Sequence, residues 1–292
     1  MNTILDDFKK HVKDNPEKIS LIFDDKQISY GKLYELSQLL SSSLFNLKKS
    51  SIISIFLENS IDFVISYFGI IFAGMIPHLI PINLSDEKIK QQLQNAAPIL
   101  IISSEKLIDK INDISYDCKK ITASQLILDK KILENRILPR NDIAYLIYTS
   151  GTTGEPKGVP ITHENIKFST MNIINKLDYS ISDVNILPLP LYHSFGLGCL
   201  HVSISIGSTL VLLKNATNLM TILDSIKNNN ATTLAAVPLT LNKILKENKN
   251  DCLNYFNNLR LIITNSTSIP SETVKSYRTI LKNGKLATYY GL

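Results

Sequence analysis

The sequence is poor in the residues that several protein classes require. Its three cysteines, Cys118, Cys199 and Cys252, lie far apart and form no C-x-x-C spacing, which argues against a disulfide framework or a zinc site. Arginine is also scarce, and the lysines are scattered among 26 acidic residues, which argues against the basic stripe of a nucleic-acid-binding protein. We expect no metal held by protein side chains alone, no nucleic-acid partner, and a reducing, cytoplasmic setting.

Uninterrupted apolar runs are missing as well. Residues 63–82 and 187–213 carry no formal charge and are long enough for comparison with a bilayer span, but glycine and proline interrupt both. Strands buried on both faces of a parallel sheet produce similar runs, so membrane spanning is disfavoured. The N-terminal residues include Asp6 and Asp7 where a secretory signal has its apolar stretch, so we expect no export.

What is present is an alternation of strand and helix patterns. The 292 residues are 44% hydrophobic, enough for the core of one or two domains. Expected strands are 19–23, 27–29, 52–57, 76–82, 99–103, 143–149 and 285–289, and expected helices are 30–47, 61–73, 86–95 and 164–176. Such alternation predicts a doubly wound, mostly parallel α/β fold. Residues 113–140 break the rhythm and are expected to be a connector.

A segment suited to anion binding follows the strand predicted at 143–149. Residues 149–154 are glycine or carry hydroxyls, so successive backbone N–H groups can point at an anion, and Lys157 adds a positive charge. The segment is not a P-loop, because this lysine comes three residues after Gly154 and no hydroxyl follows it. It is not a dinucleotide fingerprint either. A flexible linker would not explain the strand entry and the Pro156-Lys157 pair, so we predict a different phosphate cradle.

The string Y-T-S-G-T-T-G-E-P-K-G-V at 148–159 resembles the phosphate loop of the AMP-binding, adenylate-forming superfamily. That superfamily includes acyl-CoA synthetases, aryl-CoA ligases, amino-acid adenylation domains and luciferases. Segments 28–33, 72–83, 187–197 and 287–292 resemble its other motifs, in order. The resemblance implies two similar, mostly parallel sheets with helices on both faces, forming the N-terminal domain of that fold without its C-terminal subdomain. We expect a first α/β subdomain at 1–140, including an N-terminal helix and hairpin, and a second at 141–292.

The activity implied by the resemblance is that of an AMP-forming ligase. Such an enzyme joins a carboxylic acid to ATP with Mg²⁺, releases pyrophosphate, and transfers the acyl group to CoA or to the phosphopantetheine of an acyl carrier protein. The acid is already ionised at neutral pH, so electrostatic stabilisation matters more than a general base. Residues 192–197 lack the aspartate that would pair with an amino acid's ammonium, which favours a fatty or aryl acid and a role in fatty acid metabolism.

Site residues follow from the same resemblance. His193 is expected where the acyl pocket meets the α-phosphate, and it and Lys157 are the catalytic candidates. Segment 264–270 matches the adenine and acyl pocket but departs from the family at Asn265 and Ser266. The expected nucleotide contacts are Thr149, Ser150, Gly151, Thr152, Thr153, Gly154, Lys157, Thr267, Ser268 and Tyr290.

Three expectations remain open beside this reading. Residue 292 falls inside a family motif, so we expect part of a longer ligase, inactive by itself. An amino-acid adenylation enzyme is one alternative. A non-catalytic nucleotide- or acyl-binding module is the other.

Overall fold

The computed structural model describes residues 3–127, 142–150, 156–248, 252–281 and 284–288. The chain forms two compact units, which are described separately. The first comprises Met1–Lys18, Ser29–Ser169 and Tyr192–Ser194, and the second comprises Ile19–Ile28, Thr170–Leu191 and Phe195–Leu292. The subdomain boundary expected at residue 140 falls within 128–141, outside the described residues, and stays a prediction.

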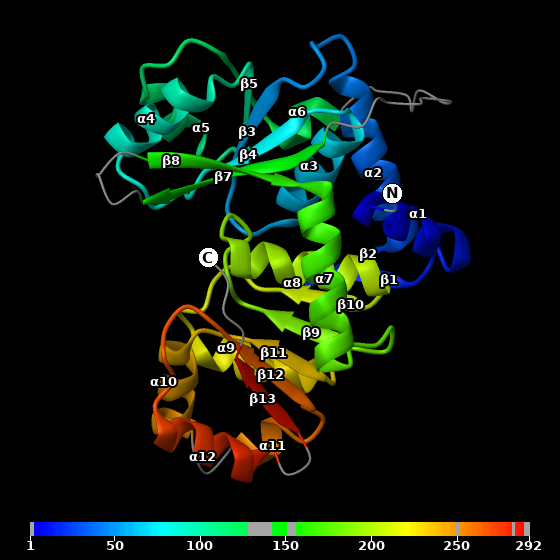
Figure 1. Ribbon diagram of the computed structural model, residues 1–292, viewed down its shortest axis with the longest axis vertical. Coiled ribbons are helices and arrows are strands. Elements are labelled where there is room, and N and C mark those ends of the chain that lie inside the picture. The colour runs from blue at the N-terminus through cyan, green and yellow to red at the C-terminus, as the bar shows by residue number, and fades with distance from the viewer. Residues whose placement is uncertain (1–2, 128–141, 151–155, 249–251, 282–283, 289–292) are drawn as a thin grey trace. The chain divides into compact units, whose positions relative to one another are not determined.

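A mostly parallel sheet forms the centre of the first unit. In spatial order its strands are β6 (Lys119–Thr122), β5 (Leu100–Ser103), β3 (Ile52–Phe56), β4 (Ile76–Leu79), β7 (Ile143–Ser150) and β8 (Pro156–Thr162). Neighbouring strands run parallel except for the antiparallel pair β7 and β8 at one edge (Figure 1). The strands expected at 52–57, 76–82, 99–103 and 143–149 are therefore confirmed, each within a few residues.

Helices pack on both faces of this sheet. They are α1 (Ile4–Asp14), α2 (Tyr30–Ser43), α3 (Ile61–Phe72), α4 (Asp86–Ala96), α5 (Ile108–Asp113) and α6 (Ala123–Ile127). Ser29 and Ser60 cap α2 and α3 by accepting a hydrogen bond from the amide three residues later. Helix α3 is nearly all buried, which accounts for the uncharged run that begins at Phe63. Among the described residues, no helix is both long and apolar enough to cross a bilayer.

The segment expected to be a connector, 113–140, is partly regular structure. Strand β6 lies at the edge of the sheet, paired with β5, and α6 follows it directly. The expectation was wrong here because β6 contains Lys119 and Lys120, which resemble connector residues in sequence. Edge strands commonly carry lysine, since only one side of such a strand has a neighbour.

A second mostly parallel sheet forms the centre of the second unit. Its strands, in spatial order, are β13 (Lys285–Thr288), β12 (Leu261–Thr264), β11 (Thr233–Ala235), β9 (Val184–Leu187), β10 (Thr209–Leu212), β1 (Ile19–Phe23) and β2 (Lys26–Ser29). Strand β1 joins this sheet by pairing in parallel with β10, with Leu21 opposite Leu210. The hairpin expected near the N-terminus is confirmed, and it completes a sheet whose other strands come from the second half of the chain.

Helices also cover both faces of the second sheet. They are α8 (Ser194–Ile206), α9 (Leu219–Asn228), α10 (Pro238–Asn248), α11 (Cys252–Tyr255) and α12 (Ser271–Ile280), while the chain passes between the units within α7 (His163–Leu177). Ile186 faces the core formed with α9, α10 and α12. Asn185 points the other way, and its amide donates to Ser203 of α8 at 3.0 Å. Two packed faces around a parallel sheet confirm the expected fold class.

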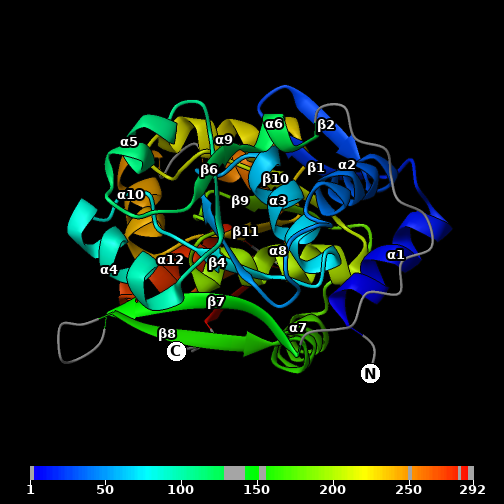
Figure 2. The same cartoon turned by 90° about the horizontal axis from the view of Figure 1, so that it is seen from above.

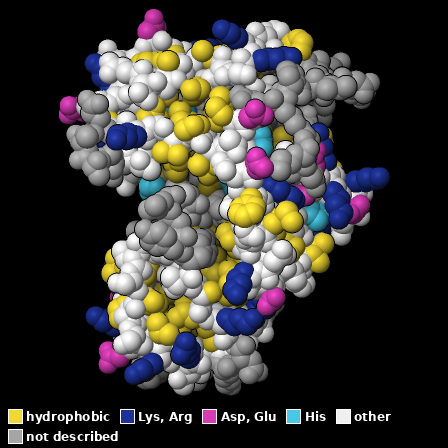
Figure 3. Space-filling view, viewed as in Figure 1, with side chains coloured by type: hydrophobic (Ala, Val, Ile, Leu, Met, Phe, Trp, Pro, Cys, Tyr) yellow, Lys and Arg dark blue, Asp and Glu magenta, His cyan; other side chains and the backbone are white. Residues whose placement is uncertain are grey.

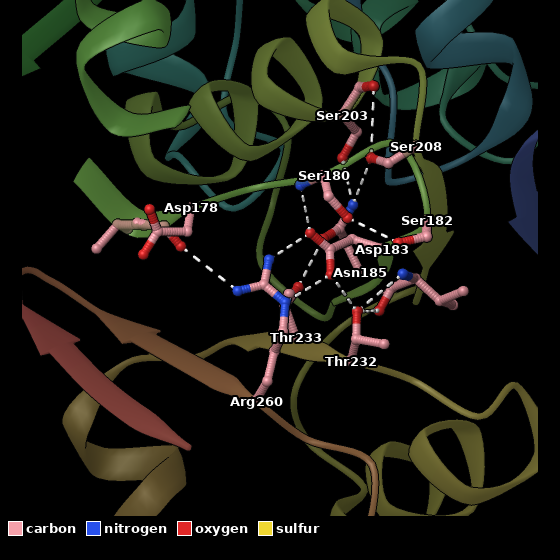
Figure 4. A network of polar contacts seen from close by, with 12 residues as sticks. Asp178, Ser180, Ser182, Asp183, Asn185, Ser203, Ser208, Thr232, Thr233 and Arg260 are labelled. Carbon is pink, nitrogen blue, oxygen red and sulfur yellow. Dashed lines mark hydrogen bonds and ion pairs between the residues drawn. The ribbon is translucent and has the colours of Figure 1, made fainter. Parts of the chain in front are cut away.

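A network of polar contacts joins the amino ends of β9, β11 and β12. Figure 4 shows Asp183, just before β9, between Arg260 and Thr232. The Asp183 carboxylate accepts hydrogen bonds from the Arg260 guanidinium, from the Thr232 hydroxyl at 2.7 Å and from the Ser180 amide at 2.7 Å. Burial alone would raise the pKa of Asp183, but these donors outweigh it and hold that pKa below its ordinary value. The network therefore fixes one end of the sheet with a charged, buried group.

Candidate nucleotide-binding site

Strands β7 and β8 form the hairpin that carries the predicted phosphate cradle. The two strands lie side by side (Figure 2), and their antiparallel register places Thr149 opposite Lys157 and Ser150 opposite Pro156. Both Thr149 and Lys157 have exposed side chains. The structure thus brings together, on adjacent strands, a hydroxyl and a lysine expected to contact phosphate, and it places both in strands rather than in the connecting segment.

Part of the predicted site lies outside the described residues. These candidates are Gly151, Thr152, Thr153, Gly154 and Tyr290. Their roles stay predictions, as does that of the Ser150 side chain. The described part of this site therefore consists of the two strand ends that flank 151–155.

The hairpin joins the rest of the first unit through the pairing of β7 with β4 and through side-chain contacts of Tyr148. The Tyr148 hydroxyl donates to Asn95 Oδ1 of α4 at 2.5 Å. Its ring lies 5.0 Å from the His78 ring, centroid to centroid, and packs beside a small apolar cluster that includes Leu146. Across the hairpin, a Cβ added to Gly158 would approach the ring and hydroxyl of Tyr148 to 3.1 Å, so glycine there leaves room for the tyrosine.

His78 itself is completely buried and is fixed by its neighbours. The Ser54 hydroxyl lies 2.9 Å from Nδ1. The buried Gln92 side chain also interacts with the His78 ring, and by itself this interaction would raise the pKa of His78. Burial lowers the pKa of His78 to about 3, so the imidazole is neutral at physiological pH.

The second catalytic candidate, His193, lies between β9 and α8. Its ring makes an edge contact with Tyr192 at a centroid distance of 4.9 Å. Desolvation lowers the pKa of His193 below its ordinary value although part of the side chain reaches solvent, so the imidazole is neutral at pH 7. A neutral imidazole can donate one hydrogen bond and accept another.

The first turn of α8, directly after His193, depends on a glycine. A Cβ added to Gly196 would overlap the carbonyl group of Pro190, with 2.8 Å to its carbon. At Gly198, one half-turn further, an added Cβ meets nothing within 4 Å. Only the first of these two glycines is therefore required by packing, and it is the one that the 187–197 motif contains.

In the second unit, the segment after β12 has the geometry of a glycine-rich turn without its glycines. Ser266 has φ 87°, a left-handed conformation that favours glycine, and its amide is bound by the Asn265 side chain at 2.6 Å. Thr267 and Ser268, the expected adenine contacts, are exposed. Thr264, at the end of β12, is fully buried, and no described residue hydrogen-bonds to its hydroxyl. Polar groups are thus available at the carboxyl end of this strand, where ligands bind in α/β sheets.

Charge at the surface agrees with a local anion site rather than an extended one. On the face shown in Figure 3, the Lys and Arg side chains of the described residues are scattered among acidic and apolar ones. Among the described residues of the hairpin, Lys157 is the only lysine or arginine. Such an arrangement can bind a small phosphate-bearing ligand at one point of the sheet edge.

Comparison with known proteins identifies the family. The AMP-binding enzyme family matches residues 8–292, and the chain belongs to it. It is 26% identical over 289 residues to 4-coumarate–CoA ligase 3 from Arabidopsis thaliana, covering 91% of this chain and 51% of that protein. It is 29% identical over 235 residues to 2-succinylbenzoate–CoA ligase from Bacillus velezensis, covering 80% of this chain and 48% of that protein. The chain spans about half the length of these curated relatives.

The fold matches solved structures of the same kind. O-succinylbenzoate coenzyme A synthetase from Bacillus subtilis, in complex with ATP and magnesium ion, has a TM-score of 0.87 and 26% identity, covering 98% of this chain and 59% of that one. The same synthetase in complex with its acyl-adenylate intermediate also has a TM-score of 0.87, with 25% identity and the same 98% of this chain covered, against 58% of that one. The predicted family and fold class are confirmed.

Sequence reasoning missed the residues that hold the hairpin in place. Asn95, on α4, lies outside every motif quoted for the family, while His78, on β4, lies within the 72–83 segment but is not among the predicted site residues. Asn95 sits in a polar helix segment where it resembles any exposed residue, and its partner Tyr148 is 53 positions away. Since no local pattern joins two such positions, only the folded structure reveals the pair.

Proposed function

We propose that this chain is the nucleotide-binding part of a ligase that activates a carboxylic acid with ATP. The products of that step are an acyl-adenylate and pyrophosphate, and the acyl group then passes to a thiol of CoA or of a carrier protein. The observation that supports this most is the β7–β8 register, which sets Lys157 beside Thr149 at the entrance and exit of 151–155. Membership of the AMP-binding family gives that arrangement its chemical meaning.

The roles proposed for the residues follow from charge. The main electrostatic demand of the reaction is to stabilise the charge on the pyrophosphate as it leaves. Lys157 would neutralise part of that charge. The Thr149 hydroxyl and the residues between the strands would donate hydrogen bonds to it. Bound Mg²⁺ would supply further positive charge to the same phosphates. His193, neutral at pH 7, would orient the acid's carboxylate by hydrogen bonding without adding a charge.

For the acid, we propose a fatty or aryl substrate. Residues 192–197 contain no carboxylate to pair with an amino acid's ammonium, and burying an unpaired ammonium is costly. Amino acids remain the alternative substrate class, and a nucleotide-binding module without catalysis remains the alternative to an enzyme.

Calorimetric titration of the chain with ATP and Mg²⁺ tests the binding step. Lys157→Met removes one charge-assisted contact and is expected to raise the Kd for ATP by about tenfold or more. Lys119→Met is the matched control, because Lys119 is an exposed lysine on the opposite edge strand of the same sheet. Equal effects of the two substitutions, or no ATP binding by the wild-type chain, would contradict the proposed site.

Pyrophosphate exchange tests the chemistry. The assay compares fatty acids of graded length, aryl acids and amino acids, with ATP present throughout. Exchange stimulated by fatty or aryl acids supports the proposal, and stimulation by amino acids alone would replace it with the adenylation alternative. Because this part of a ligase is expected to be inactive by itself, only ATP binding without exchange by the longer protein, for every acid, would favour the non-catalytic module.

A further inference from the structure

A hydrogen bond joins Tyr148 of the β7–β8 hairpin to Asn95 of helix α4. We propose that Asn95 is a positioning residue, which acts through Tyr148 to fix the β7–β8 hairpin for binding the β- and γ-phosphates of ATP. This inference rests on the proposed function, since it assigns a partner to the same site. It adds a helix, α4, to the elements on which nucleotide binding depends.

The geometry links Asn95 directly to the end of the hairpin. The Tyr148 hydroxyl donates to Asn95 Oδ1 at 2.5 Å. Tyr148 lies two residues before Ser150, whose pairing with Pro156 is the last described pair before 151–155. Helix α4 also lies against β8, as Figures 1 and 2 show from two directions. Fixing the tyrosine therefore fixes the direction in which both strand ends leave the sheet.

Asn95 is a firm anchor because α4 is itself immobilised. Its inner side contributes Ile89 and Leu93, both fully buried in the core with Phe56. The asparagine lies on the following turn of the same helix, at its exposed side. A hydrogen bond to a helix held by a packed core limits movement more than one to a loop would.

Two further neighbours contact the half-buried Tyr148 ring. The buried His78 ring lies 5.0 Å away on one side, and Gly158 on the neighbouring strand leaves the space that a side chain would fill. These contacts restrict where the ring lies, and the bond to Asn95 holds its far end. Burial raises the pKa of Tyr148, so its hydroxyl stays protonated and able to donate at neutral pH.

Positioning and simple stabilisation make different predictions. If the Asn95–Tyr148 bond only stabilised the fold, its loss would weaken the binding of every nucleotide alike. If it preorganises the hairpin for phosphates, its loss weakens ATP, whose β- and γ-phosphates the hairpin is proposed to hold, and spares AMP, which lacks them. The ratio of the two Kd values is therefore the informative quantity.

The test is a double-mutant cycle on the chain, with Tyr148→Phe, Asn95→Ala and the combined variant. Kd values for ATP with Mg²⁺ and for AMP are measured by calorimetry, and thermal unfolding is followed in parallel. Tyr148→Phe keeps the ring and its packing and removes only the donor. The control is Tyr116→Phe, which removes a hydroxyl that donates to the Pro98 carbonyl in the same unit.

We expect each single substitution to raise the Kd for ATP by about three- to tenfold, the range of one net hydrogen bond, with AMP changed less than about twofold. The double variant should match the single ones, because both remove the same bond. Suppose that the wild-type chain binds ATP more tightly than AMP. The positioning role alone would then be overturned if the variants kept the wild-type Kd for ATP, or if their Kd values for ATP and AMP rose equally. It would also be overturned if the effects of the two single substitutions added in the double variant. A wild-type chain that binds ATP no better than AMP would overturn the proposed phosphate site and this inference with it.

Discussion

The buried carboxylate of Asp183 allows a quantitative prediction for the second unit. Asp183 is 2% exposed, and the Arg260 guanidinium is its counter-ion. Arg260→Met would leave the carboxylate with the Thr232 hydroxyl and the Ser180 amide but no positive charge. Removing one partner of a buried pair costs about 3–5 kcal/mol. Since the Arg260 side chain is 35% exposed, we expect the lower end, about 3 kcal/mol, or on the order of 6–12 °C in Tm.

The stability lost on Arg260→Met should also depend on pH, and the direction of that dependence can be derived. In the wild-type chain the pKa of Asp183 is lowered, so this group stabilises the fold above its unfolded pKa and loses that contribution as pH falls through the folded value. Without Arg260, burial dominates and raises the pKa of Asp183. The variant's aspartate then takes up a proton at higher pH, which removes the unpaired charge. The difference in stability between wild type and Arg260→Met should therefore shrink as pH falls from 7 toward 4.

Urea denaturation followed by far-UV circular dichroism measures both effects, because the chain contains no tryptophan for fluorescence. Lys285→Met is the control: it breaks the Lys285–Asp178 ion pair, whose side chains are 65% and 69% exposed, and should leave the urea midpoint unchanged. An Arg260→Met variant within about 1 kcal/mol of wild type at pH 7, or a difference that does not vary with pH, would refute the reasoning.

Three further predictions concern the first unit and the first turns of α8. Because the folded pKa of His78 is about 3, unfolding takes up a proton, so stability should fall by up to about 4 kcal/mol from pH 6.5 to 3; His78→Asn should flatten that part of the urea-midpoint curve. Gly196→Ala should lower stability by about 1–3 kcal/mol or more through overlap with Pro190. Gly198→Ala, which meets no atom, should leave Tm unchanged or raise it slightly.

The fold could be predicted from the sequence where burial leaves a strong pattern. Central strands such as β3 and β5 are buried on both faces, and their runs of apolar residues predict strands from the sequence alone. Strand β6 was not, because an edge strand needs less burial and its lysines look like loop residues. The pairing of β1 with β10 also left no local sign, since the two strands are far apart in sequence and parallel pairing needs no connecting turn.

The candidate site was predictable to the extent that one segment carries it. The register of Thr149 and Lys157 follows from a strand, a short segment and a second strand, which the motif contains. Asn95 could not be found in this way, because its function depends on meeting Tyr148 after folding. The phosphate cradle is a local feature of the chain, whereas its support comes from residues remote in sequence.

The pairing of β1 with β10 has a consequence for synthesis of the chain. Leu21 leaves the ribosome early, yet Leu210, opposite it, is made nearly two hundred residues later. Until then the first strand has no neighbour on that side, and an unpaired strand is exposed to wrong partners. The pairing of β1 with β10 therefore forms only after translation has reached Leu210. A protein cut within 128–141 and produced as two pieces would have to recover this pairing between them, which makes complementation of the pieces a direct measure of its strength.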